Sequence, residues 1–135
     1  MEISNTQSMT HLSHPTAAAL KAANFPQPAP APGQFWYNLN GDLCCVIYSK
    51  QDWSFKIRYI NSPNRGGWLE EGKFIYCPTA EDILRELGDE WTLGTYYEGW
   101  VCMDQTAYMP IYRYIHESAA EACAMAWLDK NKNKI

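Results

Sequence analysis

Aromatic residues are concentrated in one stretch of this chain, and that concentration constrains the fold more than any other feature. Seventeen of the nineteen aromatic side chains fall between Phe35 and Tyr114. Aromatic and β-branched residues suit a pleated, half-buried surface, and each buried ring removes a large apolar area from water. The stretch therefore predicts a run of short β-strands. A chain of 135 residues has a limited interior, so some rings are expected to reach the surface.

The composition is that of an ordinary globular protein, with 47% hydrophobic residues, 19% charged residues and a net charge of −4. The length fits one domain, so we expect a flexible leader at residues 1–14 and a single domain at residues 15–135. The opening residues lack the pattern of a secretory signal, and no apolar run approaches the roughly 20 residues that span a bilayer. A cytoplasmic protein that does not enter a membrane is expected.

Seven strands are predicted. Asn40-Gly41 favours a type I′ turn between the first two strands. In the third, apolar residues alternate with polar ones, so that one face is apolar and the other polar. Residues 61–67 are dense in turn formers and are interpreted as a loop. The expected strands are 35–39, 43–48, 53–60, 73–77, 91–97, 100–103 and 108–115.

Three helices are predicted, and the first covers residues 15–24. Ser13 or His14 caps its start, and alanine, the best helix former, fills its interior. Residues 25–34 follow with a proline at every second position from 26 to 32. Such a segment is stiff and extended, so we expect a strap that leads from the helix to the sheet.

The second and third helices carry capping signals. Thr79 and Asp82 form an imperfect capping box, with Asp in place of Glu, and Ser118 and Glu121 form a proper one. The third helix is apolar nearly all round as far as Leu128, and such a helix is buried on several sides. It packs deeply against the sheet or forms part of a subunit interface.

The element order is helix, four strands, helix, three strands, helix, and each connection between strands is short enough for antiparallel pairing. We therefore predict an α+β fold. Its antiparallel sheet has about five to seven strands, and its two to three helices pack mainly on one face.

No catalytic motif occurs in the sequence. The one arrangement suited to covalent chemistry is a cysteine nucleophile, Cys77 or Cys102, activated by His116. Neither cysteine lies beside a recognisable motif, and a capping role suits a histidine at the entrance of the last helix. We assign no catalytic residue, and a small Cys/His hydrolase or transferase is kept as the alternative function.

The five cysteines are odd in number and contain no C-x-x-C pair. Reduced thiols are expected, with no metal site and no cofactor.

Loop aromatics give the better functional signal. Trp68, Tyr97 and Trp100 lie in or beside glycine-containing loops, and Arg65 lies close to the first of them. Tryptophan, tyrosine and arginine dominate the binding energy of protein interfaces, so these four are candidate binding residues. Core packing is the alternative for the three rings, as it is the expectation for strand rings such as Trp36.

A third hypothesis is a nucleic-acid-binding module of the αβββα type that recognises double-stranded RNA, because residues 15–88 approach that element order. Such a module needs a basic start to its second helix, where this chain has Glu81 and Asp82. The only basic cluster is Lys130, Lys132 and Lys134, so no nucleic-acid partner is expected.

A resemblance to known proteins is carried by Ala19–Pro28 leading to Pro32–Tyr37, by Cys77–Leu87 and by Ser118–Leu128. These stretches resemble small uncharacterised proteins of phages and integrated mobile elements of gut Bacteroidota. The resemblance spans residues 15–132 and brings no established activity with it. Small accessory proteins of such elements often bind other proteins. The resemblance therefore implies a non-catalytic interaction protein whose partner is a host or phage protein, with a homodimer as a further expectation.

Overall fold

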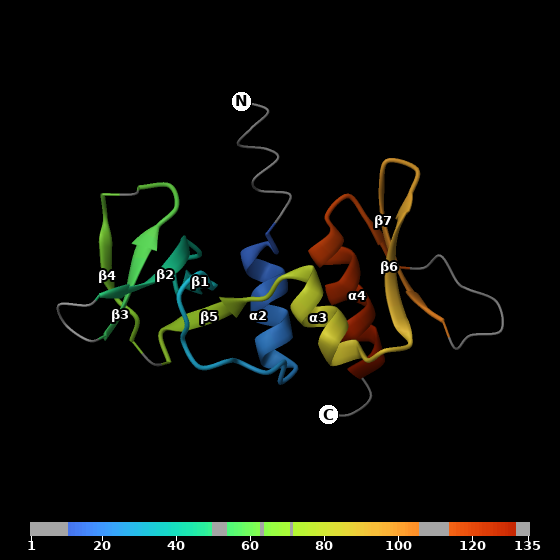
Figure 1. Ribbon diagram of the computed structural model, residues 1–135, viewed down its shortest axis with the longest axis horizontal. Helices are drawn as coiled ribbons and strands as arrows, with labels where there is room; N and C mark the ends of the chain where they lie inside the picture. Colours follow the sequence, from blue (N-terminus) through green and yellow to red (C-terminus); the bar gives the residue numbers. More distant parts are fainter. Residues whose placement is uncertain (1–10, 50–53, 63, 71, 106–113, 132–135) are drawn as a thin grey trace. The chain divides into compact units, whose positions relative to one another are not determined.

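The computed structural model of the protein describes residues 11–49, 54–62, 64–70, 72–105 and 114–131 (Figure 1). Its contacts divide the chain into two compact units. One unit is residues 24–77, and the other joins residues 1–23 to residues 78–135. The prediction of a single domain over 15–135 stays a prediction.

The α+β class and the antiparallel pairing are confirmed among the described residues. The helices are α2 (His14–Ala22), α3 (Ala80–Leu87) and α4 (Ala119–Asn131). The strands are β1 (Phe35–Asn38), β2 (Leu43–Ser49), β3 (Ser54–Tyr59), β4 (Gly66–Trp68), β5 (Phe74–Cys77), β6 (Trp91–Tyr96), β7 (Gly99–Asp104) and β8 (Tyr114–His116).

The strands form two sheets, where the sequence suggested one. In the unit 24–77, five strands pair in the order β4-β3-β2-β1-β5, and all neighbours are antiparallel. In the other unit, β6, β7 and β8 form a three-stranded antiparallel sheet. Helix α3 separates the two groups of strands along the chain, and the strands that follow it pair with one another.

The hairpin between β1 and β2 is confirmed, but its predicted turn type is wrong. Gly41 has a φ of 88°, whereas Asn40 does not have the positive φ that a type I′ turn needs at both central positions. The Gly41 N–H donates to the Asn38 carbonyl at 3.1 Å, and the Asn38 N–H donates to the Asp42 carbonyl at 3.0 Å. The loop therefore has three residues, and glycine supplies the left-handed position at its end.

Strand β4 begins inside the segment 61–67 that was interpreted as a loop, so that interpretation is wrong for residues 66 and 67. Gly66 pairs with Arg58, and Gly67 pairs with Ile57. A Cβ atom on Gly66 would lie 2.7 Å from the Ile57 carbonyl oxygen. The missing side chain, which suggested a turn, is what allows the two strands to approach.

The core of the five-stranded sheet lies on one of its faces. Trp36, Val46 and Tyr76 form a buried cluster there, as expected for Trp36, and the Trp36 and Tyr76 ring centroids are 5.2 Å apart. Three partly buried side chains pack against this cluster: Phe55, Leu69 and Phe74.

The proline-rich segment 25–34 is hydrogen-bonded to the five-stranded sheet at two places. The Gly33 N–H donates to the Val46 carbonyl, and the Val46 N–H donates to the Gln34 carbonyl, both at 2.9 Å. The Gln27 side-chain oxygen accepts the Tyr76 N–H at 3.0 Å. This last bond satisfies a donor on the outer edge of β5, so the strap covers that edge at Tyr76.

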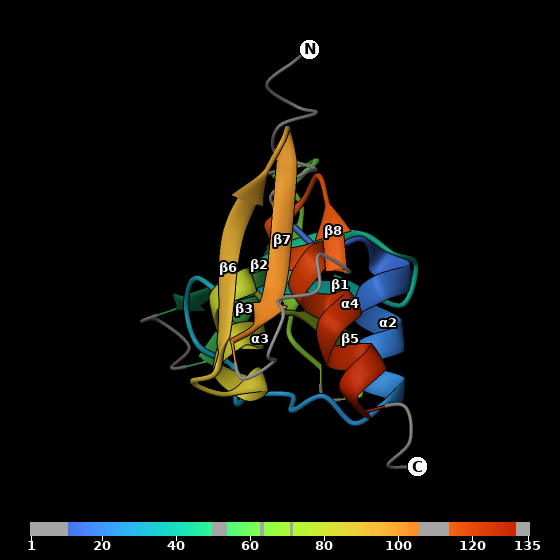
Figure 2. The same cartoon turned by 90° about the vertical axis from the view of Figure 1, so that its right-hand side faces the viewer.

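Helix α4 is the centre of the other unit. It packs against α2, α3, β7 and β8, and Figure 2 shows it beside β7 and β8. The expectation of a helix buried on several sides is confirmed, and the neighbouring elements of the same unit provide the burial. Its buried residues are Ala120, Ala122, Cys123, Ala124, Ala126 and Trp127.

Helix α2 begins at His14, one residue earlier than expected, and the Ser13 hydroxyl caps it by accepting the Thr16 N–H at 3.3 Å. Asn24 has a φ of 70°, which is typical of the residue just beyond a helix. Leu12 is fully buried. Residues 1–10 of the expected leader lie outside the described residues.

The capping box of α3 is confirmed, because Thr79 and Asp82 each accept the other's backbone N–H at 3.1 Å. The capping box of α4 is only half present. The Ser118 hydroxyl accepts the Glu121 N–H at 3.3 Å, but the Ser118 N–H donates to Nδ1 of His116 at 2.9 Å. His116 therefore takes the place that the box assigns to Glu121.

The Glu121 carboxylate instead joins α4 to the start of α2. It accepts the Thr16 hydroxyl at 2.9 Å and the Ser13 N–H at 3.3 Å. A carboxylate at the N-terminal ends of two helices is stabilised by both dipoles. Tertiary contacts have therefore replaced a local capping bond.

Two predicted strand ends lie outside the described residues. They are Trp53, at the start of the third predicted strand, and residues 108–113, including Pro110, in the last one.

The close approach at Gly66 gives a first testable prediction. Gly66→Ala should lower the free energy of unfolding of the unit 24–77 by about 1–3 kcal/mol, because the added methyl group meets the Ile57 carbonyl. Gly67→Ala is the matched control, since its Cβ would meet no atom within 4 Å, and it should change stability by at most about 0.5 kcal/mol. Urea unfolding of both variants measures the difference, and equal effects would contradict the tight pairing.

The position of Glu121 gives a second prediction. A double-mutant cycle of Glu121→Gln with Thr16→Val should show a coupling of about 1 kcal/mol, because the carboxylate accepts the Thr16 hydroxyl. The cycle of Glu121→Gln with Ser118→Ala is the control for a local capping box. Coupling to Ser118 in place of Thr16 would refute the tertiary role.

Candidate functional site

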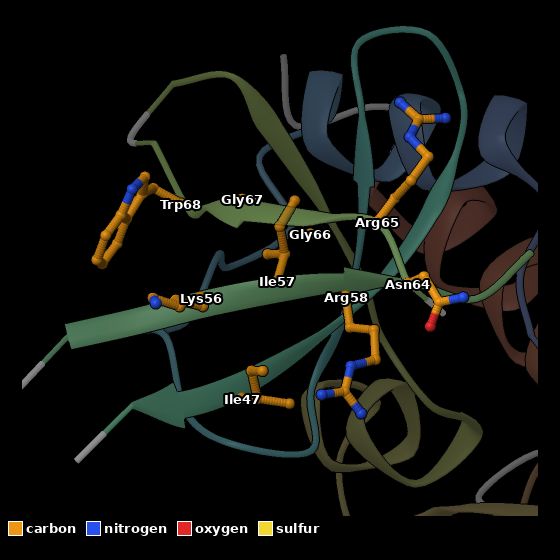
Figure 3. A pocket seen from close by; sticks show the side chains of 9 residues that line it. All are labelled: Ile47, Lys56, Ile57, Arg58, Asn64, Arg65, Gly66, Gly67 and Trp68. Atoms are coloured by element: carbon orange, nitrogen blue, oxygen red, sulfur yellow. The ribbon is translucent and has the colours of Figure 1, made fainter. Parts of the chain in front are cut away.

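A concave surface of about 340 Å³ lies over β2, β3 and β4 of the unit 24–77 (Figure 3). Three strands and the loop that leads into β4 provide its lining. The residues are Ile47, Lys56, Ile57, Arg58, Asn64, Arg65, Gly66, Gly67 and Trp68. We call this surface the basic groove.

The register of the strands determines which side chains meet in the basic groove. Lys56 lies opposite Trp68 across the β3–β4 pair, and Arg58 lies opposite Gly66. Because side chains alternate along a strand, these residues share one face, while Ile57 faces the core and is 3% exposed. The Lys56 Nζ stands 4.8 Å from the centre of the Trp68 ring. A cation in this position stabilises the exposed ring in its observed orientation by about 0.5–1 kcal/mol.

The basic groove has a charge opposite to that of the whole chain. Among the residues that the structure describes, its lining includes three cationic side chains, those of Lys56, Arg58 and Arg65, and no carboxylate, although the net charge of the protein is −4. Like charges that line one concave surface attract anionic groups and raise their local concentration. The groove can therefore bind an anionic ligand that also contacts an aromatic ring.

Arg65 contributes less directly to the positive charge of the basic groove than its place in the lining suggests. Its guanidinium carbon lies 4.8 Å from the centre of the Tyr59 ring, and Figure 3 shows its side chain pointing away from that of Arg58. Lys56, Arg58 and Trp68 are therefore the central residues of the groove.

A second concave surface of about 320 Å³ lies toward the face that carries Ile57 and Tyr59, and Gly67 and Trp68 border both surfaces. The charged residues in its described lining are Glu70 and Lys73, which form an ion pair with an N–O distance of 2.8 Å. Because those charges cancel, this surface lacks the positive character of the basic groove.

The structure places the four predicted binding residues in two units. Arg65 and Trp68 belong to the unit 24–77, while Tyr97 and Trp100 belong to the other. The three rings are exposed to different extents: 50% for Trp68, 90% for Tyr97 and 38% for Trp100. Their role in binding stays a prediction.

Tyr97 lies at the tip of the β6–β7 hairpin in a strained backbone conformation. Its φ is 54°, a left-handed value that costs a residue with a side chain about 1–2 kcal/mol. Tyr96 pairs with Gly99, so the turn is Tyr97-Glu98, one residue earlier than the turn between the predicted strands 91–97 and 100–103. The Tyr97 ring stands edge-on to Tyr96, with centroids 4.6 Å apart.

In the structure, Cys102 and His116 do not form the nucleophile–base pair that the sequence allowed. Cys102 is fully buried, and its thiol is hydrogen-bonded to that of Cys123. This hydrogen bond and burial both raise the pKa of Cys123, so its thiol stays protonated. The Nδ1 atom of His116 accepts the Ser118 N–H, and in the described part of the chain His116 makes no hydrogen bond with a cysteine.

Cys77, the other predicted nucleophile, lies at the end of β5 in the unit 24–77 and is 2% exposed. Cys44, in the same sheet, is fully buried. Burial, and secondarily the negative charge of Asp42, raise the pKa of Cys44 to about 11. The Cys44 thiol is therefore protonated at neutral pH and is a poor nucleophile.

All five cysteines are thiols in the structure. Within the described ranges, no cluster of three or more His, Cys, Asp or Glu side chains could hold a metal ion. The helices among those same residues are too short or too polar to cross a bilayer. Comparison with known proteins found no matching protein family, no matching curated protein and no matching solved structure.

Sequence reasoning missed Lys56 and Arg58 as site residues, since it interpreted them only as the polar face of a strand. Their neighbours across the strand pair, Trp68 and Gly66, come from a segment that was interpreted mostly as loop. A Lys-x-Arg alternation followed by Gly-Gly-Trp is the signal that could have found the groove, once the second segment is recognised as a strand.

The burial of the thiols gives a third prediction. When the folded protein is treated with iodoacetamide at pH 8, Cys45, the one partly exposed cysteine, should be alkylated first. Cys44, Cys77, Cys102 and Cys123 should react only at the rate of unfolding, because an alkylating agent needs an exposed thiolate. Mass spectrometry of tryptic peptides gives the order, with urea-unfolded protein as the control. Rapid labelling of Cys77 or Cys102 would revive the cysteine-nucleophile alternative.

Proposed function

We propose that this protein is a non-catalytic binding protein, and that the basic groove on the unit 24–77 is where it binds a partner protein. The observation that carries the proposal is the combination of cations and an exposed tryptophan on one concave surface whose described lining contains no carboxylate. Lys56 and Arg58 provide the charge, and Trp68 provides the ring. Tryptophan and arginine are the residues most enriched among those that dominate interface energies.

The chemistry of the groove suits an acidic segment of the partner. Carboxylates attracted by Lys56 and Arg58 would form charge-assisted hydrogen bonds, which are shorter and stronger than neutral ones. An apolar side chain of the same segment would pack on the half-exposed Trp68 ring. The charges would speed up association and select the partner, while the ring would supply apolar contact area.

The surroundings of the cysteines and of His116 favour binding over catalysis. Cys102 and Cys123 hydrogen-bond to each other in the core, and His116 caps α4. These contacts use the groups that a Cys/His hydrolase would need as nucleophile and base.

We further propose that the protein is an accessory protein of a phage or mobile element, cytoplasmic, with a host or phage protein as its partner. The support for this origin is the resemblance of residues 15–132 to such proteins. The five thiols suit a reducing compartment. A homodimer stays a further proposal.

Selection from a library of displayed random 12-residue peptides tests this function and is the fourth prediction. The wild-type protein should enrich peptides with several Asp or Glu residues. The variant Lys56→Ser/Arg58→Ser should lose at least about tenfold in affinity for them, because both charges that face the ligand are gone.

The matched control for this selection is Lys73→Ser/Arg85→Ser, which removes the same two positive charges elsewhere. Both of its residues are well exposed, at 65% and 67%, and their ion pairs are of the kind that contributes little to stability. The control should keep the affinity of the wild type. Equal losses in the two variants would mean that only net charge matters, and selection without acidic enrichment would reject the function.

A further inference from the structure

We infer that the partner's acidic segment binds as an additional β-strand along the outer edge of β4. This inference rests on the proposed function and specifies how the segment is held. Strand β4 is the last strand of the five-stranded sheet (Figure 1), and all three of its residues are exposed. An edge strand presents backbone donors and acceptors to any extended chain that matches them.

The hydrogen-bond pattern identifies the backbone groups that are available. The Tyr59 N–H donates to the Arg65 carbonyl at 3.2 Å, so this is a hydrogen-bonded pair of the β3–β4 ladder. Hydrogen-bonded pairs alternate with non-bonded ones in antiparallel strands, so Gly67 and Ile57 form the next bonded pair. The N–H and C=O groups of Gly66 and Trp68 therefore point outward, away from β3.

The two edges of the sheet differ in the way that strand addition requires. On the β5 edge, the Gln27 side chain accepts the outward N–H of Tyr76, which leaves that donor unavailable to another chain. On the β4 edge, no described residue makes a comparable bond to Gly66 or Trp68. Proteins protect edges that are not meant to pair, so the uncovered edge is the one suited to a partner.

The charges around β4 specify an acidic strand. Gly66 has no side chain, so no side chain of β4 stands between Arg58, directly opposite it, and a strand added at the edge. Lys56 stands over the Trp68 ring at the same face. In a strand added beside β4, every second side chain faces this surface. Carboxylates at those alternate positions would meet Lys56 and Arg58, and this pairing fixes which face of the added strand turns toward the groove.

The same charges disfavour a second copy of this chain as the occupant. Pairing of two β4 strands would place another Lys56 and another Arg58 on the same face as the first pair. Although these charges lie on β3 and not on the paired strands, cations gathered on one surface repel one another, whereas an acidic segment is attracted to them.

To test this inference, a capped nine-residue peptide of alternating glutamate and valine is added to the nitrogen-15-labelled full chain. Amide hydrogen exchange is then measured residue by residue. At saturating peptide, the amide hydrogens of Gly66 and Trp68 should exchange at least about tenfold more slowly, because each gains a hydrogen bond. The Gly67 amide, which faces β3, should change far less. Binding without protection of Gly66 and Trp68 would overturn strand addition and leave acidic recognition intact.

A matched pair of variants tests the same bond without relying on exchange rates. Trp68→Pro and Trp68→Val both remove the ring, but only proline also removes the outward N–H, which makes no bond to β3. The proline variant should bind the peptide at least about tenfold more weakly than the valine variant. Equal affinities of the two folded variants, or no binding of the peptide to the wild-type protein, would refute the inference.

Two other occupants are outcomes of the same experiment. Binding of a nine-residue oligothymidylate in preference to the peptide would overturn the inference in favour of single-stranded nucleic acid. A wild-type dimer in light scattering that Trp68→Pro converts to a monomer would overturn it in favour of self-pairing. A monomeric wild type that binds the peptide and ignores the oligonucleotide supports it.

Discussion

The candidate site depends on one close approach, that of Gly66 to the Ile57 carbonyl. Any side chain at Gly66 would meet that oxygen at 2.7 Å, so only glycine lets β4 approach β3 this closely without a shift of the backbone. This pairing fixes the register that places Trp68 beside Lys56 and puts no side chain opposite Arg58. The same register turns Ile57 into the core. One steric requirement therefore sets the edge of the sheet, the arrangement of charges and the exposure of the ring.

The five-stranded sheet treats its two edges differently, and the proline-rich strap accounts for part of the difference. The strap places Gln27 against β5 and hydrogen-bonds to Val46 on β2, so it protects one edge and extends the pairing of β1 with β2. Strand β4 at the opposite edge is short, contains two glycines and has cations nearby. Short length and positive charge are common ways of discouraging edge-to-edge aggregation. The same features leave the edge open to a strand of opposite charge. They therefore keep the protein soluble and make the groove selective for its partner.

Local signals predicted the helices well and the turns less well. Thr79 and Asp82 interact within four residues, so nothing outside α3 is needed to form their capping box. Glu121 was expected to do the same for α4, but the Thr16 hydroxyl lies near it in space and competes for its carboxylate, while His116 accepts the Ser118 N–H. Sequence spacing shows which local bonds are available and cannot show a competing partner about a hundred residues away. The Gly66-Gly67 pair was misinterpreted because glycine is common both in loops and where two strands approach closely.

The sequence by itself determined the α+β class, most strand and helix positions and the caps of α2 and α3, because these follow from short-range periodicity and local hydrogen bonding. It also indicated Arg65, Trp68, Tyr97 and Trp100 as candidates for contact. Only the tertiary structure decided that the strands form two sheets and that these four residues belong to two units. It alone showed that Lys56 and Arg58 accompany Trp68. Strand order and cross-strand register are long-range properties, set by which segments bury their apolar faces together, and they leave no fixed spacing in the chain.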